Sequence, residues 1–214
     1  MHPSYSNITS PRLDLIYRDD TLIVVNKPAG LLAVPGRGAG KQDCLASRVQ
    51  AAFPDALVVH RLDMATSGLL LFARGAEMQR HLSHLFRERL VSKCYVAVVS
   101  GRLELLAGEI DLPLMRDWPN RPRQKVDFAS GKPSLTRYRV LAHDDGTTRV
   151  ELEPVTGRTH QLRVHMAASG HPILGDALYG EEVGAERLLL HASALNFAHP
   201  LNTEPLRLAS DPPF

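Results

Sequence analysis

An arginine and an aspartate stand two positions apart in residues 60–68, which read His-Arg-Leu-Asp-Met-Ala-Thr-Ser-Gly. Apolar runs flank this segment at 57–59 and 69–72, and such runs indicate buried strands. A carboxylate at the mouth of two buried strands is expensive to desolvate unless another group pairs with it or a reaction uses it. Asp63 is therefore a candidate catalytic group from its placement alone.

A second polar segment supplies a partner for this carboxylate. Residues 157–165, Gly-Arg-Thr-His-Gln-Leu-Arg-Val-His, place several hydrogen-bond donors between apolar residues. If Arg163 faces Asp63, its charge keeps the carboxylate ionised. Tyr95 begins an otherwise apolar strand and offers an aromatic face to the same pocket. Composition and spacing alone leave a structural Asp–Arg pair as compatible with these residues as a catalytic pair.

Motifs for other chemistries fail on spacing. The glycine-rich residues 36–41 do not form a phosphate-binding loop, because Pro35 replaces its first glycine and Gln42 its metal-binding Ser or Thr; we expect a mobile loop there. No Gly-x-Ser-x-Gly of a serine hydrolase occurs. We expect no metal site, because no acid or cysteine completes a familiar ligand spacing around His81, His84, His160, His165 or His171.

Positive charge is concentrated in one stretch of the chain. The 214 residues carry a formal net charge of only +2 and are 44% apolar, which suits one domain with a substantial core. Residues 111–139 hold seven basic and three acidic side chains, a balance of +4. A basic surface on a nearly neutral protein is able to bind phosphates, although scattered solvated charge gives the same count.

Localisation and assembly are inferred from features that the sequence lacks. The two cysteines, Cys44 and Cys94, do not suggest a disulfide framework. The N-terminus has no basic-then-apolar signal pattern, and no apolar run approaches the roughly 18 residues of a membrane span. We expect a cytoplasmic protein without membrane association and, since no long apolar stripe is left for a partner, a monomer.

Hydrophobic periodicity predicts few helices and many short strands. Asp43 is expected to cap a helix that runs to Phe53, an amphipathic helix spans 75–89, and Thr159 is expected to cap a helix that stops at Gly170. Strands are expected at 13–17, 22–26, 95–99, 135–142, 148–153, 188–197 and 206–208.

Consecutive strands with few helices favour an α+β fold over a doubly wound one. We expect a single domain, residues 13–214, with a mainly antiparallel mixed sheet flanked by helices and loops. Residues 1–12 are polar and contain prolines, and they are predicted to form a flexible N-terminal arm. Residues 110–133, rich in prolines and arginines, are predicted to form a long functional loop.

Six motifs, in order along the chain, resemble those of the RluA-type pseudouridine synthases. Residues 60–68 are similar to the family's His-Arg-Leu-Asp-x-x-Thr-Ser-Gly, and residues 157–165 to its Gly-Arg-[Ser/Thr]-His-Gln-[Ile/Leu]-Arg-Val-His. The other four matches are Asn-Lys-Pro-Ala-Gly-Leu at 26–31, Lys-Cys-Tyr-Val-Ala at 93–97, His-Pro-Ile-Leu-Gly-Asp at 171–176 and Leu-Leu-His-Ala at 189–192. No S4-like RNA-binding domain, which many relatives carry, is expected here.

This resemblance implies that residues 13–214 form a catalytic domain that isomerises uridine to pseudouridine within RNA, without a metal or cofactor. It implies that Asp63 is the catalytic aspartate, that Arg163 supplies its counter-charge and that Tyr95 stacks on the target base. Arg61 is expected to fill the space that the flipped base leaves. Further RNA contacts are expected from His60, His160, Arg116, Arg121, Arg123 and Lys125.

The short chain and residues 117–122, Asp-Trp-Pro-Asn-Arg-Pro, resemble family members that modify both tRNA and 23S rRNA. The resemblance therefore implies one target in a tRNA anticodon stem-loop and another in a 23S rRNA loop. An enzyme restricted to rRNA and a non-catalytic RNA-binding module on the same fold are the alternatives. A small-molecule hydrolase that uses Asp63 lacks a recognisable base or metal set.

Overall fold

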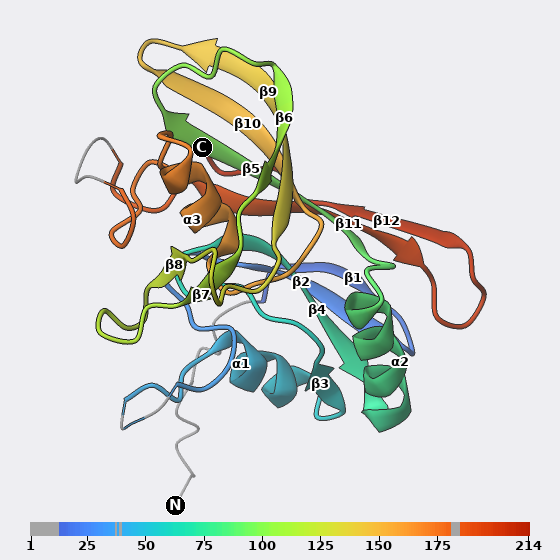
Figure 1. Cartoon of the computed structure of the whole chain (residues 1–214). Helices are drawn as coiled ribbons and strands as arrows, with labels where there is room; N and C mark the ends of the chain where they lie inside the picture. The colour runs from blue at the N-terminus through green and yellow to red at the C-terminus, as the bar shows by residue number, and fades with distance from the viewer. Residues whose placement is uncertain (1–12, 37, 39, 181–184) are drawn as a thin grey trace, which may run out of the picture.

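The computed structural model describes residues 13–36, 38, 40–180 and 185–214 (Figure 1). The arm predicted for residues 1–12 therefore lies outside the described residues, as do positions 37 and 39 of the glycine-rich loop. None of the described helices is long and apolar enough to cross a membrane.

Twelve strands and three helices are present in the described residues. The helices are α1 (Leu45–Ala52), α2 (Gly75–Arg87) and α3 (Gln161–Ala168). The strands of the first half are β1 (Leu15–Arg18), β2 (Leu22–Lys27), β3 (Ala56–Val58), β4 (Ser67–Arg74), β5 (Ser92–Ser100) and β6 (Ala107–Asp111). Those of the second half are β7 (Leu114–Arg116), β8 (Gln124–Val126), β9 (Leu135–Asp144), β10 (Thr147–Pro154), β11 (Leu190–Ala198) and β12 (Pro205–Ala209).

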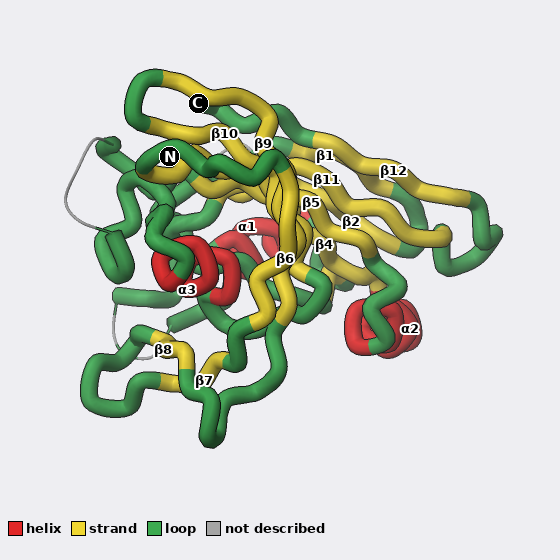
Figure 2. Tube along the Cα trace, turned by 45° about the horizontal axis from the view of Figure 1, so that its top comes forward, coloured by secondary structure: helices red, strands yellow, loops and turns green. Residues whose placement is uncertain are grey.

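One large sheet organises most of these strands. Its order is β1-β2-β4-β11-β5-β10-β9-β6, with β3 beside β4 and β12 beside β11. All of these strand pairs are antiparallel except β4 with β11. A separate hairpin, β7–β8, lies near α3 (Figure 2). The predicted α+β class with a mainly antiparallel mixed sheet is confirmed.

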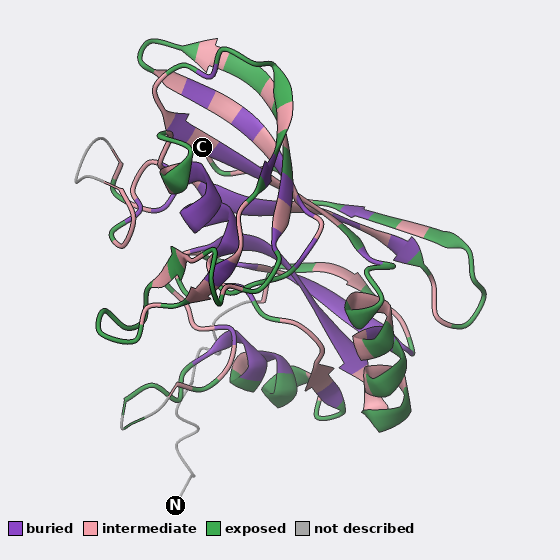
Figure 3. Ribbon diagram, in the orientation of Figure 1, coloured by how far each residue is buried: buried purple, intermediate pink, exposed green. Residues whose placement is uncertain are grey.

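The central strands are covered on both faces, because successive side chains of a strand point to opposite sides. On one face, Ile23 and Phe72 pack in the cluster that contains α1. On the other face, Leu22 packs with Leu82 of α2. Tyr95 packs against both the α1 cluster and the α3 cluster, so α1 and α3 cover the same face. Figure 3 shows how thoroughly α3 is buried there.

Two predicted helix caps are wrong. Cys44 precedes α1, and its sulfur accepts a hydrogen bond from the Ser47 backbone N–H at 3.4 Å, whereas Asp43 lies one residue outside the cap. His160, not Thr159, precedes α3; it has a left-handed φ of 55° and makes no side-chain capping hydrogen bond. The usual N-cap hydrogen bond is therefore missing at the helix that carries Arg163.

The region predicted as a loop, 110–133, contains more structure than expected. β6 ends inside it at Asp111, and β7 and β8 form a hairpin within it. Strands of three residues are too short for an alternating pattern to reveal them. All of the predicted strands are present, and their ends differ from the predicted ends by at most three residues.

Candidate active site

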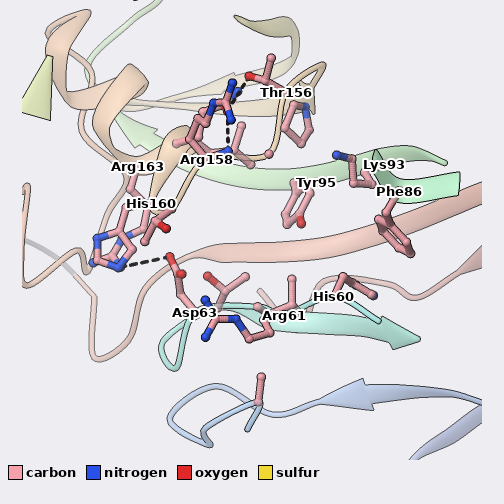
Figure 4. Close-up of a pocket in the computed structure, with 18 of the residues that line it drawn as sticks. His60, Arg61, Asp63, Phe86, Lys93, Tyr95, Thr156, Arg158, His160 and Arg163 are labelled. Atoms are coloured by element: carbon pink, nitrogen blue, oxygen red, sulfur yellow. Dashed lines mark hydrogen bonds and ion pairs between the residues drawn. The ribbon is translucent and has the colours of Figure 1, made fainter. Parts of the chain in front are cut away.

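A cleft of about 710 Å³ opens on the face of the sheet that α1 and α3 cover. Its walls come from the loop between β3 and β4, from β5 and from the loop that leads into α3. Asp63, Tyr95 and Arg163 all line this cleft (Figure 4). The fold thus brings together residues that lie up to 100 positions apart in the sequence.

The loop between β3 and β4 holds Asp63 at the cleft. Its turn closes where the Thr66 backbone N–H donates to the Asp63 carbonyl oxygen at 3.1 Å, and β4 begins directly afterwards. Gly68 has a φ of 114°, and a Cβ at this position would collide with the backbone of Ala192 in β11. Glycine therefore permits the close approach of β4 and β11 next to the loop that holds Asp63.

Lys27 ties this loop to the one that follows β2. Its side chain is fully buried, and Nζ donates to the carbonyl oxygens of Pro28 at 2.9 Å, Leu31 at 2.7 Å and Met64 at 3.0 Å. Burial lowers the pKa of Lys27 to about 8. The Asn-Lys-Pro motif therefore supports the residue that follows Asp63 and does not itself line the main cleft.

Arg163 is held between two carboxylates. Its Nε and Nη2 donate to the two oxygens of Asp176 at 2.7 and 2.6 Å, and its Nη1 donates to Oδ2 of Asp63 at 3.4 Å. The side chains of Arg163 and Asp176 are 5% and 0% exposed, whereas that of Asp63 is 26% exposed. Burial acts to lower the pKa of Arg163, but the carboxylates of Asp176 and Asp63 together outweigh burial and raise it. Asp176 therefore holds the charged guanidinium of Arg163 in place. The Asp63 carboxylate, on the other side of Arg163, remains accessible from the cleft.

Tyr95 supplies the aromatic surface of the cleft. It is half-buried on β5, and its ring projects into the cleft in Figure 4. Burial, reinforced by the negative charge of Asp63, raises the pKa of Tyr95 far above its usual value. The ring is therefore a neutral, flat surface on which a base is able to stack.

His160 lies beside Asp63 where α3 begins. Its Nε2 is 3.8 Å from Oδ2 of Asp63, and its Nδ1 is 2.7 Å from Oη of Tyr179. Burial lowers the pKa of His160, although the charge of Asp63 opposes this shift. The imidazole is therefore neutral at pH 7. The RNA contact predicted for His160 stays a prediction.

Arg61 and His60 occupy different surroundings. Arg61 is exposed at the cleft and forms no hydrogen bond or ion pair with the residues that the structure describes. His60 stacks on Phe86 with ring centroids 4.5 Å apart, and its Nε2 accepts from the Leu71 backbone N–H at 3.0 Å. Burial lowers the pKa of His60 to about 3. Arg61 is available to a ligand, whereas His60 supports the loop; the RNA contacts predicted for both stay predictions.

The basic residues predicted to bind phosphate lie in three different environments. Arg116 and Arg121 lie 4.9 and 5.0 Å from the ring centroid of Trp118, which is 56% exposed. Arg123 instead lies 5.4 Å from the ring centroid of Tyr179, next to the cleft. Lys125 pairs with Asp127, the residue that follows β8, at 3.4 Å. Their predicted phosphate contacts stay predictions.

Two more arginines of the basic segment 111–139 do not lie on the β7–β8 hairpin. Arg137 and Arg139 lie on β9, where they pair with Glu109 at 2.8 Å and Glu151 at 2.9 Å. The sequence count of +4 therefore overstates the unpaired positive charge of the hairpin.

Four further residues at the site have no role in the sequence-based predictions: Asp176, Tyr179, Lys93 and Arg158. Asp176 is the last residue of the motif at 171–176, and the motif alone does not indicate that this acid pairs with Arg163. Lys93 and Arg158 add cationic side chains to the walls of the cleft. Among the described residues, no three His, Cys, Asp or Glu side chains gather in a way that would hold a metal ion.

Known proteins similar to this chain share one activity in their names. A sequence model described as RNA pseudouridylate synthase matches residues 21–168, the range that holds Asp63, Tyr95 and Arg163. The dual-specificity RNA pseudouridine synthase RluA of Pasteurella multocida (strain Pm70) is 50% identical over 215 residues, which cover 99% of this chain and 98% of the relative. The RluA of Escherichia coli (strain K12) is 50% identical over 201 residues, 92% of each chain.

Solved structures agree with this match. Human RNA pseudouridylate synthase domain containing 1 has a TM-score of 0.79 and 32% identity, with 100% of this chain and 87% of the human chain covered. Human RNA pseudouridylate synthase domain containing 4 has a TM-score of 0.75 and 26% identity, with 93% and 88% covered. By its sequence and its fold, the chain belongs to the RNA pseudouridylate synthase family.

Proposed function

We propose that this protein isomerises specific uridines to pseudouridine in two kinds of RNA, a tRNA anticodon stem-loop and a 23S rRNA loop. The observation that carries the chemistry is the Asp63 carboxylate, which Arg163 contacts from inside the protein and which faces a cleft lined by Tyr95. Two kinds of target agree with the name of the 50% identical relatives, dual-specificity RNA pseudouridine synthase.

The reaction breaks the bond between the ribose C1′ and N1 of uracil, turns the base, and joins C1′ to C5. C5 then loses its proton and N1 gains one, so that substrate and product are isomers. Asp63 either attacks the sugar carbon or removes the 2′ proton, and both steps require an ionised carboxylate at contact distance. Arg163 places a positive charge beside this carboxylate, with Nη1 3.4 Å from Oδ2 of Asp63. The neutral ring of Tyr95 holds the detached base flat in the cleft while it turns.

The target base must first leave its stack, at a cost of a few kcal/mol. Arg61 is exposed at the edge of the cleft, and its planar guanidinium is suited to fill the vacated space by stacking and hydrogen bonding. The arginines of the β7–β8 hairpin would then contact the phosphates of the surrounding loop. Residues 13–214 would act as one catalytic domain and as a monomer in the cytoplasm.

Tritium release from RNA labelled at C5 of uridine tests this proposal, because C5 loses its proton only if the base is rejoined through carbon. We expect release from transcripts of both a tRNA and a 23S rRNA fragment. Pseudouridine mapping in RNA from a strain that lacks the protein should reveal one missing site in each class. Loss at ribosomal sites alone would leave an enzyme restricted to rRNA, and binding without any release would favour a non-catalytic RNA-binding module.

A further inference from the structure

One hydroxyl group connects the β7–β8 hairpin to the catalytic carboxylate. Oη of Tyr179 accepts a hydrogen bond from the backbone N–H of Gln124 in β8 at 2.7 Å. The same oxygen lies 2.7 Å from Nδ1 of His160, whose Nε2 faces Oδ2 of Asp63 at 3.8 Å. Neither the family motifs nor the proposed chemistry assigns a role to Tyr179.

The direction of these hydrogen bonds determines which nitrogen of His160 carries the proton. A phenol has one proton to donate, and the amide of Gln124 can only donate to Oη. Among the described residues, Nδ1 of His160 is the one acceptor that an O–H of Tyr179 reaches at hydrogen-bond distance. If Tyr179 donates to Nδ1, the proton of the neutral imidazole must lie on Nε2.

The groups around His160 agree with this tautomer. Asp63, Arg163, Asp176 and Tyr179 are the ionisable residues that face it. A lone pair on Nε2 would point at the negative charge of Asp63 and repel it, whereas an N–H there is attracted to it. The distance of 3.8 Å exceeds the about 3.2 Å of a hydrogen bond, and such contacts commonly shorten when a substrate closes the site.

The backbone of His160 indicates that its position is imposed by its surroundings. Its φ is 55°, a left-handed conformation that residues other than glycine adopt rarely. It begins α3 without a side-chain cap, so capping does not account for this conformation. Strained residues of this kind persist where neighbouring contacts determine them, and they cluster at functional sites.

We infer that Tyr179 is a positioning residue that holds His160 in the tautomer with N–H on Nε2, so that a neutral donor faces Asp63 beside the charged donor Arg163. This inference rests on the proposed function, because the benefit of a second donor appears in the reaction of the carboxylate. The β7–β8 hairpin supports this position of Tyr179, because the backbone N–H of Gln124 donates a hydrogen bond to the Tyr179 oxygen.

The test uses Tyr179→Phe, which removes the hydroxyl and keeps the ring beside Arg163 and Arg123, 5.2 and 5.4 Å from its centroid. Tyr138→Phe, on β9 and also half-buried, is the matched control. The first readout is the pair of His160 ring-nitrogen NMR shifts in the protein without RNA, assigned by their loss in His160→Gln. We expect a protonated Nε2 in the wild type and in Tyr138→Phe, and a mixture of tautomers in Tyr179→Phe.

The second readout is the single-turnover rate of tritium release at saturating RNA. Tyr179→Phe should lower this rate about tenfold, the effect of one hydrogen bond, while the Kd for RNA stays within about twofold. In a His160→Gln background, Tyr179→Phe should not change the rate further. The side-chain amide of glutamine has a fixed N–H donor, so it has no tautomer for Tyr179 to select.

A protonated Nδ1 in the wild type would overturn the inference. So would an equal loss of rate from Tyr179→Phe in both backgrounds, since the tyrosine would then act by a route other than His160. If the wild type releases no tritium from any RNA, the proposed function fails, and the ring-nitrogen shifts still decide whether Tyr179 selects the tautomer.

Discussion

Arg163 and Arg121 are the same residue type in opposite surroundings. Arg163 is 5% exposed and is held by two hydrogen bonds to Asp176 and one to Asp63. Arg121 rests against the face of Trp118, itself 56% exposed, on the β7–β8 hairpin. Buried charges with full hydrogen bonding keep one geometry, whereas exposed side chains adjust to the shape of a partner. The contrast suggests that the cleft carries the chemistry and the hairpin carries RNA recognition.

The largest effect is expected from Asp63→Asn. The amide has nearly the same shape as the carboxylate but is neither a nucleophile nor a base, so the rate of tritium release should fall by roughly 10⁴-fold or more. The RNA affinity, measured by filter binding, should remain close to that of the wild type. A normal rate of tritium release by this variant would show that Asp63 is not the catalytic residue.

Asp176→Asn should reduce both activity and stability. It leaves the guanidinium of Arg163 buried without its main counter-charge, which typically costs about 3–5 kcal/mol in the free energy of unfolding. Urea denaturation measures this loss. The control is Glu109→Gln, which breaks the exposed pair with Arg137 and should have little effect, because solvent screens that pair. Equal losses in both variants would contradict the importance of the buried pair.

The double variant Arg116→Ala/Arg121→Ala tests the hairpin side of the comparison. It should weaken RNA binding and lower the slope of log Kd against log salt concentration by about 1 for each phosphate that the variant no longer binds. Arg137→Ala, on β9, is the control for a simple loss of positive charge. An unchanged salt slope in the double variant would mean that the hairpin does not bind phosphates.

The smallest effect at neutral pH is expected from His60, whose contribution to stability changes only as the pH falls. Because the pKa of His60 is about 3 in the folded protein and about 6.5 when unfolded, the unfolded chain binds its proton first as the pH falls. The contribution of neutral His60 to stability is complete above pH 6.5 and is lost between about pH 6.5 and 3. His60→Gln should flatten this part of the curve of unfolding free energy against pH. An unchanged slope would show that His60 is not buried in its neutral form.

The sequence predicted most of the strands, but not β6, β7 and β8. It also pointed to three residues that meet in the cleft, Asp63, Tyr95 and Arg163, because apolar patterns and motifs with recognisable spacing are local features. Asp63 stood out by its place between two apolar runs. The left-handed His160 and its contact with Tyr179 were not predictable, since no local rule places a hydroxyl 19 positions away beside an imidazole. Asp176 lies in a motif that the sequence reveals. Its pairing with Arg163, however, depends on how the chain turns after α3, which no local pattern predicts.

The most direct test of the contrast between cleft and hairpin compares Arg163→Lys with Arg121→Lys. Both variants keep the positive charge and lose the planar guanidinium. At saturating RNA, the single-turnover rate of tritium release should fall by roughly 10²-fold for Arg163→Lys with an unchanged Kd. Arg121→Lys should turn over at the wild-type rate and bind RNA more weakly. Equal effects of the two substitutions on rate would contradict the division between chemistry and recognition.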